Sequence, residues 1–253
     1  MSTSVETDRT IAAAFFDLDK TIISRSSTLA FGPSFYRHGL ITRGEAVRTA
    51  LAQLAFRVGG ADHNRMERIR SQVGELCRGW SADRVSEIVR RHLHEIITPL
   101  VYSEARRLIA EHGRAGQDVI IVSTSGMEMV APIGDLLGAR EVIATRMAVA
   151  DGCYTGEMEF WAYGEAKAIR VRELAMARGY RLADCYAYSD SVTDLPMLET
   201  VGHPRVVNPD RALRRIAHER HWPVLAFRAC SEHVNGQINR DHESVTHRAS
   251  QAS

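Results

Sequence analysis

Long apolar segments, paired cysteines and a charge surplus are all missing from this sequence of 253 residues. No apolar run approaches the roughly 20 residues that a membrane-spanning helix needs, and the first ten residues lack the charged and apolar regions of a signal peptide. A net charge of +1 gives no reason to expect nucleic-acid or membrane-surface binding. The four cysteines form no C-x-x-C pair, which disfavours a zinc site and predicts reduced thiols. These absences predict a cytoplasmic protein without nucleic-acid or membrane partners.

Short apolar runs alternate with helical patterns over most of the chain. Hydrophobic residues make up 45% of the sequence and charged residues 25%, and the chain is long enough to bury a sizeable core. The apolar runs expected to form strands are 11–16, 119–122, 141–145, 185–188, 205–207 and 224–227. Strands that alternate with helices predict an α/β fold with a Rossmann-like, mostly parallel sheet.

Local signals indicate where several helices and one hairpin begin. Ser125–Glu128 has the pattern of a capping box, and Asn208-Pro209 that of an N-cap followed by proline at the first helical position. A helical pattern covers 163–178. Asp151-Gly152 is typical of a hairpin turn, here within 147–160.

Residues 22 to 100 break the alternation, because helical patterns follow one another there without a convincing strand. Thr42–Glu45 is a second capping box that opens a helix, a further helix is expected over 62–77, and Ser81 is expected to cap a helix that runs to Ile96. The polar end of the chain is expected to be disordered. The predicted divisions are a core domain of 1–21 and 101–228, a helical cap domain of 22–100, and a tail of 229–253.

Two carboxylates follow the first apolar run directly. Asp17 and Asp19 are two residues apart, so on an extended chain their side chains point the same way. Close carboxylates repel each other unless a cation or a shared proton offsets the charge. The pair therefore predicts a divalent metal, and the hydroxyl of Thr21 follows it.

Three later segments have a related character, and two of them lie where a strand ends, which is where open α/β sheets bind ligands. Ser123, Thr124 and Ser125 put three hydroxyls at a helix N-terminus, which suits an anion. Lys167 lies near a helix start, where the dipole disfavours its charge, so another group is expected to need it. Asp190 and Asp194 follow the next strand. Hard oxygen ligands suit Mg²⁺, and the lysine and hydroxyls suit a phosphate.

In this order and spacing, the four segments resemble the motifs of the haloacid dehalogenase-like phosphohydrolases. The matching residues are Asp17-x-Asp19-x-Thr21, Ser123, Lys167 and Asp190-x-x-x-Asp194, and the resemblance covers roughly residues 11 to 228. About a hundred residues separate Asp19 from Ser123, so the cap resembles the helical kind that is inserted after the first motif. That arrangement is similar to subfamily IB, which contains phosphoserine phosphatase.

The resemblance implies a role for each matching residue. Asp17 would attack phosphorus and form an aspartyl-phosphate, while Asp19 would protonate the leaving alcohol and then activate water. Mg²⁺ would be held by Asp17, the backbone carbonyl of Asp19 and Asp190, with Asp194 ordering its surroundings. The residues implied to bind the phosphoryl group are Thr21, Ser123, Thr124 and Lys167.

The chain departs from the family pattern at position 26 and in the last motif, which usually reads Gly-Asp-Gly-x-Asn-Asp and here reads Ser189-Asp-Ser-Val-Thr-Asp. Phosphoserine phosphatases have a glutamate nine residues beyond the nucleophile, where this chain has Ser26, and Thr193 replaces a usual asparagine. The predicted function is therefore a Mg²⁺-dependent phosphomonoester hydrolase that acts on a small phosphorylated metabolite through an aspartyl-phosphate. The alternatives are phosphoserine phosphatase proper and a phosphotransferase or mutase on the same scaffold. A more remote alternative is a non-enzymatic phosphoacceptor or binding protein.

Overall fold

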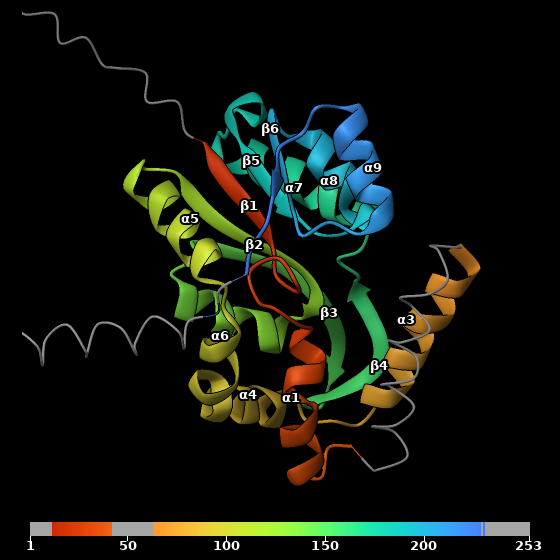
Figure 1. Ribbon diagram of the computed structural model, residues 1–253. Helices are drawn as coiled ribbons and strands as arrows, with labels where there is room; N and C mark the ends of the chain where they lie inside the picture. The colour runs from red at the N-terminus through yellow and green to blue at the C-terminus, as the bar shows by residue number, and fades with distance from the viewer. Residues whose placement is uncertain (1–11, 42–62, 229, 231–253) are drawn as a thin grey trace, which may run out of the picture.

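Seven strands form one sheet in the computed structural model, which describes residues 12–41, 63–228 and 230 (Figure 1). The order across the sheet is β4-β3-β2-β1-β5-β6-β7. The strands are β1 (Ala13–Asp17), β2 (Asp118–Gly126), β3 (Glu141–Ala150), β4 (Cys153–Phe160), β5 (Tyr186–Ser189), β6 (His203–Val207) and β7 (Val224–Leu225). Only β4, which is antiparallel to β3, departs from the parallel arrangement within the described ranges. The predicted α/β fold with a mostly parallel sheet is confirmed.

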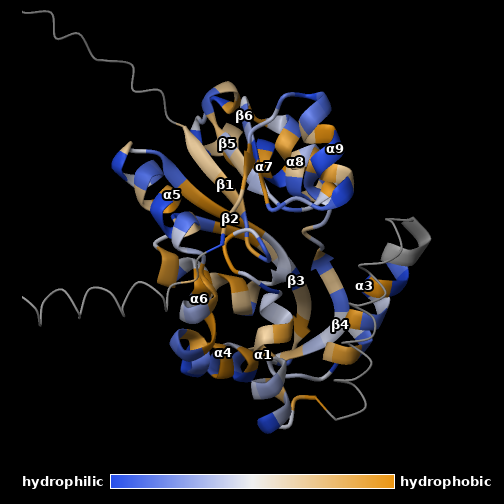
Figure 2. Ribbon diagram, in the orientation of Figure 1, coloured by the Kyte–Doolittle hydropathy of each residue, from blue (hydrophilic) through white to orange (hydrophobic). Residues whose placement is uncertain are grey.

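Helices cover both faces of the sheet and create two hydrophobic cores. On one face lie α5 (Ser103–Arg114) and α6 (Met127–Leu137); on the other lie α7 (Glu165–Arg178), α8 (Leu195–Thr200) and α9 (Arg211–Glu219). Successive strand residues point to opposite faces, so β1 places Phe16 in the first core and Phe15 in the second. Figure 2 shows apolar residues along β1 and β2 in the middle of the sheet, and mostly polar residues on the visible sides of α5 and α9. None of the described helices is both long and apolar enough to span a membrane.

Three described helices and a short 3-10 turn lie between β1 and α5. They are α1 (Ser27–Arg37), α3 (His63–Cys77), α4 (Ala82–Ile97) and the turn Thr98–Leu100. The positions of α3 and α4 agree with the sequence patterns, and Ser81 caps α4 as predicted, because its hydroxyl accepts a hydrogen bond from Arg84 N at 3.3 Å. The helix predicted to open at Thr42–Glu45 lies outside the described residues, as does the predicted tail apart from Cys230.

The predicted hairpin is present, and it meets the helical insertion. Asp151 and Gly152 turn the chain with φ angles of 52° and 77°. The backbone of Tyr154 is hydrogen-bonded to the connection between α3 and α4. Gly79 N donates to Tyr154 O at 2.8 Å, and Tyr154 N donates to Trp80 O at 2.9 Å. Figure 1 shows α3 lying along β4. The expected strand 141–145 is not separate from the hairpin: β3 pairs with β2 through its first half and with β4 through its second.

Two predicted helix starts were wrong. The N-cap of α6 is Gly126 without a side-chain cap, and the Ser125 hydroxyl bonds elsewhere. The N-cap of α9 is Asp210, whose Oδ1 accepts from Leu213 N at 2.8 Å. Asn208 instead adopts a left-handed φ of 43° and bonds through its side chain to the backbone of Phe227. In both places a tertiary partner competes successfully with the local capping pattern.

Candidate active site

The carboxyl ends of β1, β2 and β5 bring the predicted polar residues to one edge of the sheet. β1 lies between β2 and β5, with Asp17 opposite Val122 and Phe16 opposite Tyr188. The chain leaves β1 through Asp19 and β5 through Asp190, while the first turn of α7 carries Lys167 to the same edge. Segments that are up to about 170 residues apart in the chain therefore meet there.

Lys167 is the buried cation of this site. Its Nζ lies 2.7 Å from Asp17 Oδ1 and 2.9 Å from Asp194 Oδ2, and only 1% of the residue is exposed. Asp194 Oδ2 also accepts a hydrogen bond from Ser189 Oγ at 2.7 Å. Burial alone would lower the pKa of Lys167, but the two carboxylates outweigh it and raise the pKa. Lys167 therefore carries its charge at neutral pH.

The carboxylates nevertheless outnumber the buried cation. Burial raises the pKa of Asp17, and the charges of Asp194 and Asp190 raise it further against the opposing effect of Lys167. Burial likewise raises the pKa of Asp190 to about 7, although Lys20 opposes this with its Nζ 4.0 Å from Asp190 Oδ2. Three buried carboxylates facing one buried ammonium leave a negative charge that a divalent cation would offset.

The donor chemistry of this edge suits Mg²⁺. All of its free ligands are oxygens, which a hard cation prefers. In the described part of the chain, no group of three or more His, Cys, Asp or Glu side chains could hold a metal ion. Two carboxylates and a backbone carbonyl, from Asp17, Asp190 and Asp19, are the ligand set that the family resemblance implies here.

Asp19 has different surroundings from Asp17. Its Oδ1 accepts a hydrogen bond from Ser27 N at 2.8 Å, and its Oδ2 accepts one from Ser125 Oγ at 3.2 Å. Burial raises the pKa of Asp19, and the hydrogen bonds from Ser27 and Ser125 oppose that rise. One carboxylate of the pair thus meets an ammonium, while the other meets neutral donors. Two carboxylates in unlike environments are suited to unlike tasks.

The predicted phosphate-binding hydroxyls differ in whether their protons and lone pairs are already used in hydrogen bonds. Thr21 Oγ1 is buried and has no hydrogen-bond partner among the described residues, so it has both a proton and lone pairs to offer. Ser123 Oγ accepts from Ser125 N at 3.2 Å, which leaves its proton unused by that bond. Thr124 Oγ1 donates to Ala162 O at 2.8 Å. The single hydroxyl proton of Thr124 therefore points away from a phosphoryl group, and its predicted side-chain role loses support.

Sequence reasoning missed several residues of this edge. Ser125 was assigned to a helix cap, and Ser189 and Lys20 were given no role. One signal could have found Lys20: the chain contains only two lysines, Lys20 and Lys167, and otherwise uses arginine for its cations. Lys20 also has a left-handed φ of 64°, which turns its backbone at the end of the Asp17–Asp19 segment.

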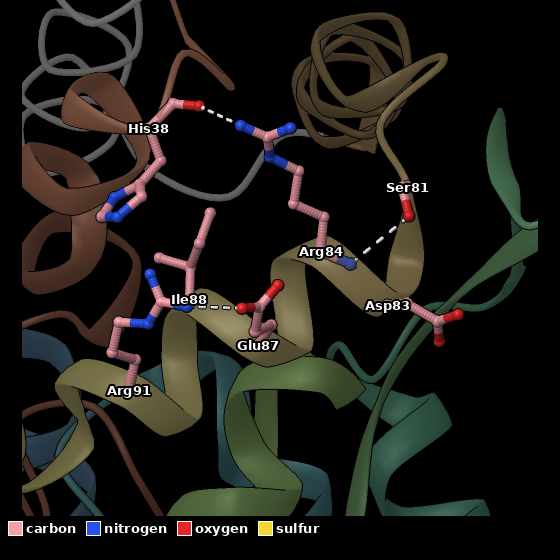
Figure 3. Close-up of a pocket in the computed structure, with 7 residues that line it drawn as sticks. All are labelled: His38, Ser81, Asp83, Arg84, Glu87, Ile88 and Arg91. Carbon is pink, nitrogen blue, oxygen red and sulfur yellow. Dashed lines mark hydrogen bonds and ion pairs between the residues drawn. The ribbon is translucent and has the colours of Figure 1, made fainter.

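A separate hollow lies on the helical insertion (Figure 3). It has a volume of about 610 Å³ and is lined by His38, Ser81, Asp83, Arg84, Glu87, Ile88 and Arg91. Both arginines of this hollow have partners: Arg84 donates to the carbonyl of His38 at 3.0 Å, and Arg91 pairs with Glu87 at 2.5 Å. Since it holds no convergent reactive groups, the sheet edge is the better candidate for chemistry.

Comparison with known proteins identifies the family to which this chain belongs. Residues 14–199 match the family model of haloacid dehalogenase-like hydrolases. An inhibition of morphological differentiation protein from Streptomyces azureus is 61% identical over 216 residues, which cover 85% of this chain and 78% of that protein. A probable phosphatase of Mycobacterium tuberculosis is 55% identical, over 87% of this chain and 76% of that protein. A histidinol-phosphatase of Neisseria meningitidis is 30% identical, over 85% and 98% respectively.

Solved structures share the fold. A Bordetella pertussis protein of unknown function superimposes with a TM-score of 0.75 at 29% identity, covering 85% of this chain and 98% of that one. A phosphoserine phosphatase, solved as an analogue of its phospho-aspartyl intermediate, has a TM-score of 0.62 at 18% identity, covering 90% and 99%. The family match spans most of the chain and contains every residue that the resemblance singled out. The chain therefore belongs to the haloacid dehalogenase-like hydrolases.

Proposed function

We propose that this protein is a Mg²⁺-dependent phosphatase that hydrolyses a small phosphomonoester through an aspartyl-phosphate on Asp17. The observation that carries the proposal is the contact of Lys167 Nζ with Asp17 Oδ1 at 2.7 Å, at the edge where Asp19 is held by neutral donors. A buried ammonium beside a buried carboxylate favours the charged form of that carboxylate and orients it. It also offsets the negative charge of an arriving phosphoryl group.

In the first step, an oxygen of the Asp17 carboxylate attacks phosphorus, and the bond from phosphorus to the substrate's alcohol oxygen breaks. Asp19 gives its proton to that leaving oxygen, so the alcohol departs neutral. In the second step, a water attacks phosphorus and gives a proton to Asp19, while the bond from phosphorus to Asp17 breaks. Inorganic phosphate leaves, and both aspartates return to their starting states.

Residues around the pair would bind rather than react. Lys167, Thr21 and Ser123 would donate to the phosphoryl oxygens, and Asp194 would hold Lys167 in place. Mg²⁺, bound by Asp17, Asp190 and the backbone carbonyl of Asp19, would supply positive charge beside the phosphoryl group. The surplus of buried carboxylates at this edge supports such a cation.

Residues 22–100 are proposed to form the cap domain that contributes substrate specificity to the core of 1–21 and 101–228. Support comes from α1, whose first residue, Ser27, contacts Asp19 directly. Ser26 is the N-cap of α1 and occupies the position where the resemblance implies a glutamate in phosphoserine phosphatases. A neutral hydroxyl there cannot pair with a substrate ammonium, which favours a phosphomonoester other than phosphoserine. The unpaired cysteines among the described residues support a cytoplasmic location.

A phosphate-release screen tests the proposal. The panel should contain phosphoserine, histidinol phosphate, sugar phosphates, polyol phosphates and lipid head-group phosphates, each with Mg²⁺ and with EDTA. We expect Mg²⁺-dependent release from at least one compound and none from Asp17→Asn, with Asp135→Asn, an exposed carboxylate on α6, as the matched control. Transfer of phosphate to an added alcohol in place of water would favour the phosphotransferase alternative. Absence of release from every compound would refute the hydrolase function.

A further inference from the structure

The carboxylate of Asp19 is held from both sides by elements that are distant in sequence. Ser27 N, at the first residue of α1, donates to Oδ1 at 2.8 Å. Ser125 Oγ, at the carboxyl end of β2, donates to Oδ2 at 3.2 Å. One donor comes from the helical insertion and the other from the core sheet. The orientation of Asp19 therefore depends on how α1 lies against β2.

The two serines also contact each other. Their Oγ atoms are 2.8 Å apart, and both residues are buried, with Ser27 fully enclosed and Ser125 8% exposed. Because Ser125 gives its only hydroxyl proton to Asp19, its oxygen is left to accept the proton of Ser27. The hydroxyls thus form a directional chain from Ser27 through Ser125 to Asp19. Thr28 Oγ1, 3.5 Å from Ser125 Oγ, lies at the margin of the same cluster.

A general acid is effective only when its proton points at the leaving oxygen, and a carboxyl group free to rotate loses that alignment. Packing alone does not explain a serine at position 125, because its hydroxyl neither caps α6 nor faces solvent. We propose that Ser125, itself oriented by Ser27, is a positioning residue that aims the Asp19 carboxyl at the leaving-group oxygen. This inference rests on the proposed phosphatase function.

Leaving groups of different basicity separate a positioning role from a merely structural one. An alkyl phosphate needs a proton on its departing alcohol, whereas p-nitrophenyl phosphate releases a stable anion and does not. The ratio kcat/KM reports only the steps up to formation of the aspartyl-phosphate, where the two substrates differ. Hydrolysis of the aspartyl-phosphate, which both substrates share, does not affect kcat/KM. Comparing kcat/KM for both substrates therefore isolates the protonation by Asp19.

For Ser125→Ala, we expect kcat/KM to fall roughly 10- to 100-fold for an alkyl phosphate found in the screen, since general acid catalysis contributes about 10²–10⁴-fold. For p-nitrophenyl phosphate we expect a fall of less than about threefold on the same grounds. Ser125→Thr, which keeps a hydroxyl, should recover most of the alkyl activity. Ser34→Ala removes another buried hydroxyl of α1 that does not touch Asp19, and it should leave both substrates unaffected.

Thermal unfolding of each variant shows whether it is folded. If Ser125→Ala is not, Ser27→Ala carries the same comparison with a smaller expected effect, because its backbone N–H to Asp19 remains. Equal losses on both substrates, or no loss on either, would overturn the positioning role while leaving the phosphatase function intact. A wild-type protein that hydrolyses neither substrate nor any compound of the screen would instead refute the phosphatase function, and this inference with it.

Discussion

Lys167 Nζ lies 2.7 Å from Asp17 Oδ1, and both residues are buried, with 1% and 7% of their surfaces exposed. Asp194 completes the arrangement on the other side of the ammonium, at 2.9 Å. Such a cluster is costly to assemble, because each charge leaves water. It is costlier still to break, since removing one member strands its partners without compensation. The stability of the fold and the charge of the site are therefore linked through one side chain.

Replacement of Lys167 by methionine should impair both stability and activity. We expect the free energy of unfolding to fall by about 3–5 kcal/mol, because Asp17 and Asp194 would be buried without their cation, and phosphate release should be lost. Urea unfolding and the phosphate assay provide the two measurements. Arg215→Met, which removes an exposed cation paired with Glu219, should change stability by less than about 0.5 kcal/mol. Similar losses in both variants would contradict a special role for the buried pair.

The scarcity of lysine permits a direct test of that burial. Lys20 and Lys167 are the only lysines, and the side chain of Lys20 is 50% exposed while that of Lys167 is 2% exposed. An amine-acylating reagent should label Lys20 quickly, which mass spectrometry detects. Lys167 should react only after denaturation, because its ammonium is enclosed and its pKa is raised by two carboxylates against the effect of burial. Rapid labelling of Lys167 in the folded protein would show that the site is open.

Mg²⁺ should stabilise the folded protein through Asp190. Burial without enough positive charge makes this carboxylate hard to ionise, so a bound cation would favour the native state. We expect Mg²⁺ to raise the melting temperature of the wild type and to have little effect on Asp190→Asn. Asp135→Asn, with an exposed carboxylate on α6, should respond as the wild type does. A full Mg²⁺ response in Asp190→Asn would place the cation elsewhere.

Much of the site could be predicted because its parts are local patterns at strand ends. Asp17 and Asp190 follow buried apolar runs, and parallel strands bring their carboxyl ends to one edge. Lys167 at a helix start implied that another group needs its charge, and Asp17 and Asp194 are those groups. No local pattern shows which carboxylates Lys167 contacts, because its two partners are 150 and 27 residues away in the chain.

Two of the failures share one physical cause, which is competition for a polar side chain. From the sequence, Ser125 could equally cap a helix or donate to an aspartate. In the structure its hydroxyl donates to Asp19, because a buried carboxylate without hydrogen-bond donors costs more free energy than an uncapped helix end. Asn208 suits an N-cap, but its amide bridges the backbone of Phe227. The continuity of β3 was likewise hidden, because pairing with β2 and with β4 is decided by neighbours rather than by its own residues.

His112 should make the fold sensitive to mild acid. This residue of α5 is buried against the sheet, where its Nε2 lies 2.8 Å from Tyr188 Oη and its Nδ1 is hydrogen-bonded to Gln117. Burial lowers its pKa, with Gln117 and Glu111 opposing and Arg205 adding to the effect. The unfolded chain therefore takes up a proton first, below a pKa of about 6.5, so stability is lost as the pH falls through that value, by up to about 1.4 kcal/mol per pH unit.

The measurement is the free energy of unfolding between pH 8 and pH 5.5 for the wild type and for His112→Gln. Both proteins share every other titrating group, so the difference between their curves isolates His112. The wild type should lose stability relative to the variant below about pH 6.5, where the unfolded imidazole becomes charged. Curves that stay parallel over this range would mean that His112 titrates alike in both states.

In the contact of α3 with β4, the backbones of Gly74 and Gly156 approach each other closely. A Cβ on Gly74 would lie 2.1 Å from the carbonyl oxygen of Gly156, far inside van der Waals contact. Gly113 also lies inside a helix, α5, but a Cβ there would meet nothing within 4 Å. Gly113→Ala should stabilise the protein by about 0.5–1 kcal/mol, because a glycine in a helix loses more chain entropy on folding than an alanine does.

Gly74→Ala should have the opposite sign and destabilise the protein by about 1–3 kcal/mol, because the backbone of β4 cannot yield as a flexible side chain would. Urea unfolding of both variants checks the contrast. The pair is informative because helix propensity favours alanine at each position, so a difference in sign must come from the neighbouring strand. If Gly74→Ala proved as stabilising as Gly113→Ala, α3 would not be seated on β4 through this close approach. The hairpin would then carry the helical insertion through its other contacts, such as the backbone pairing of Tyr154 with Gly79 and Trp80.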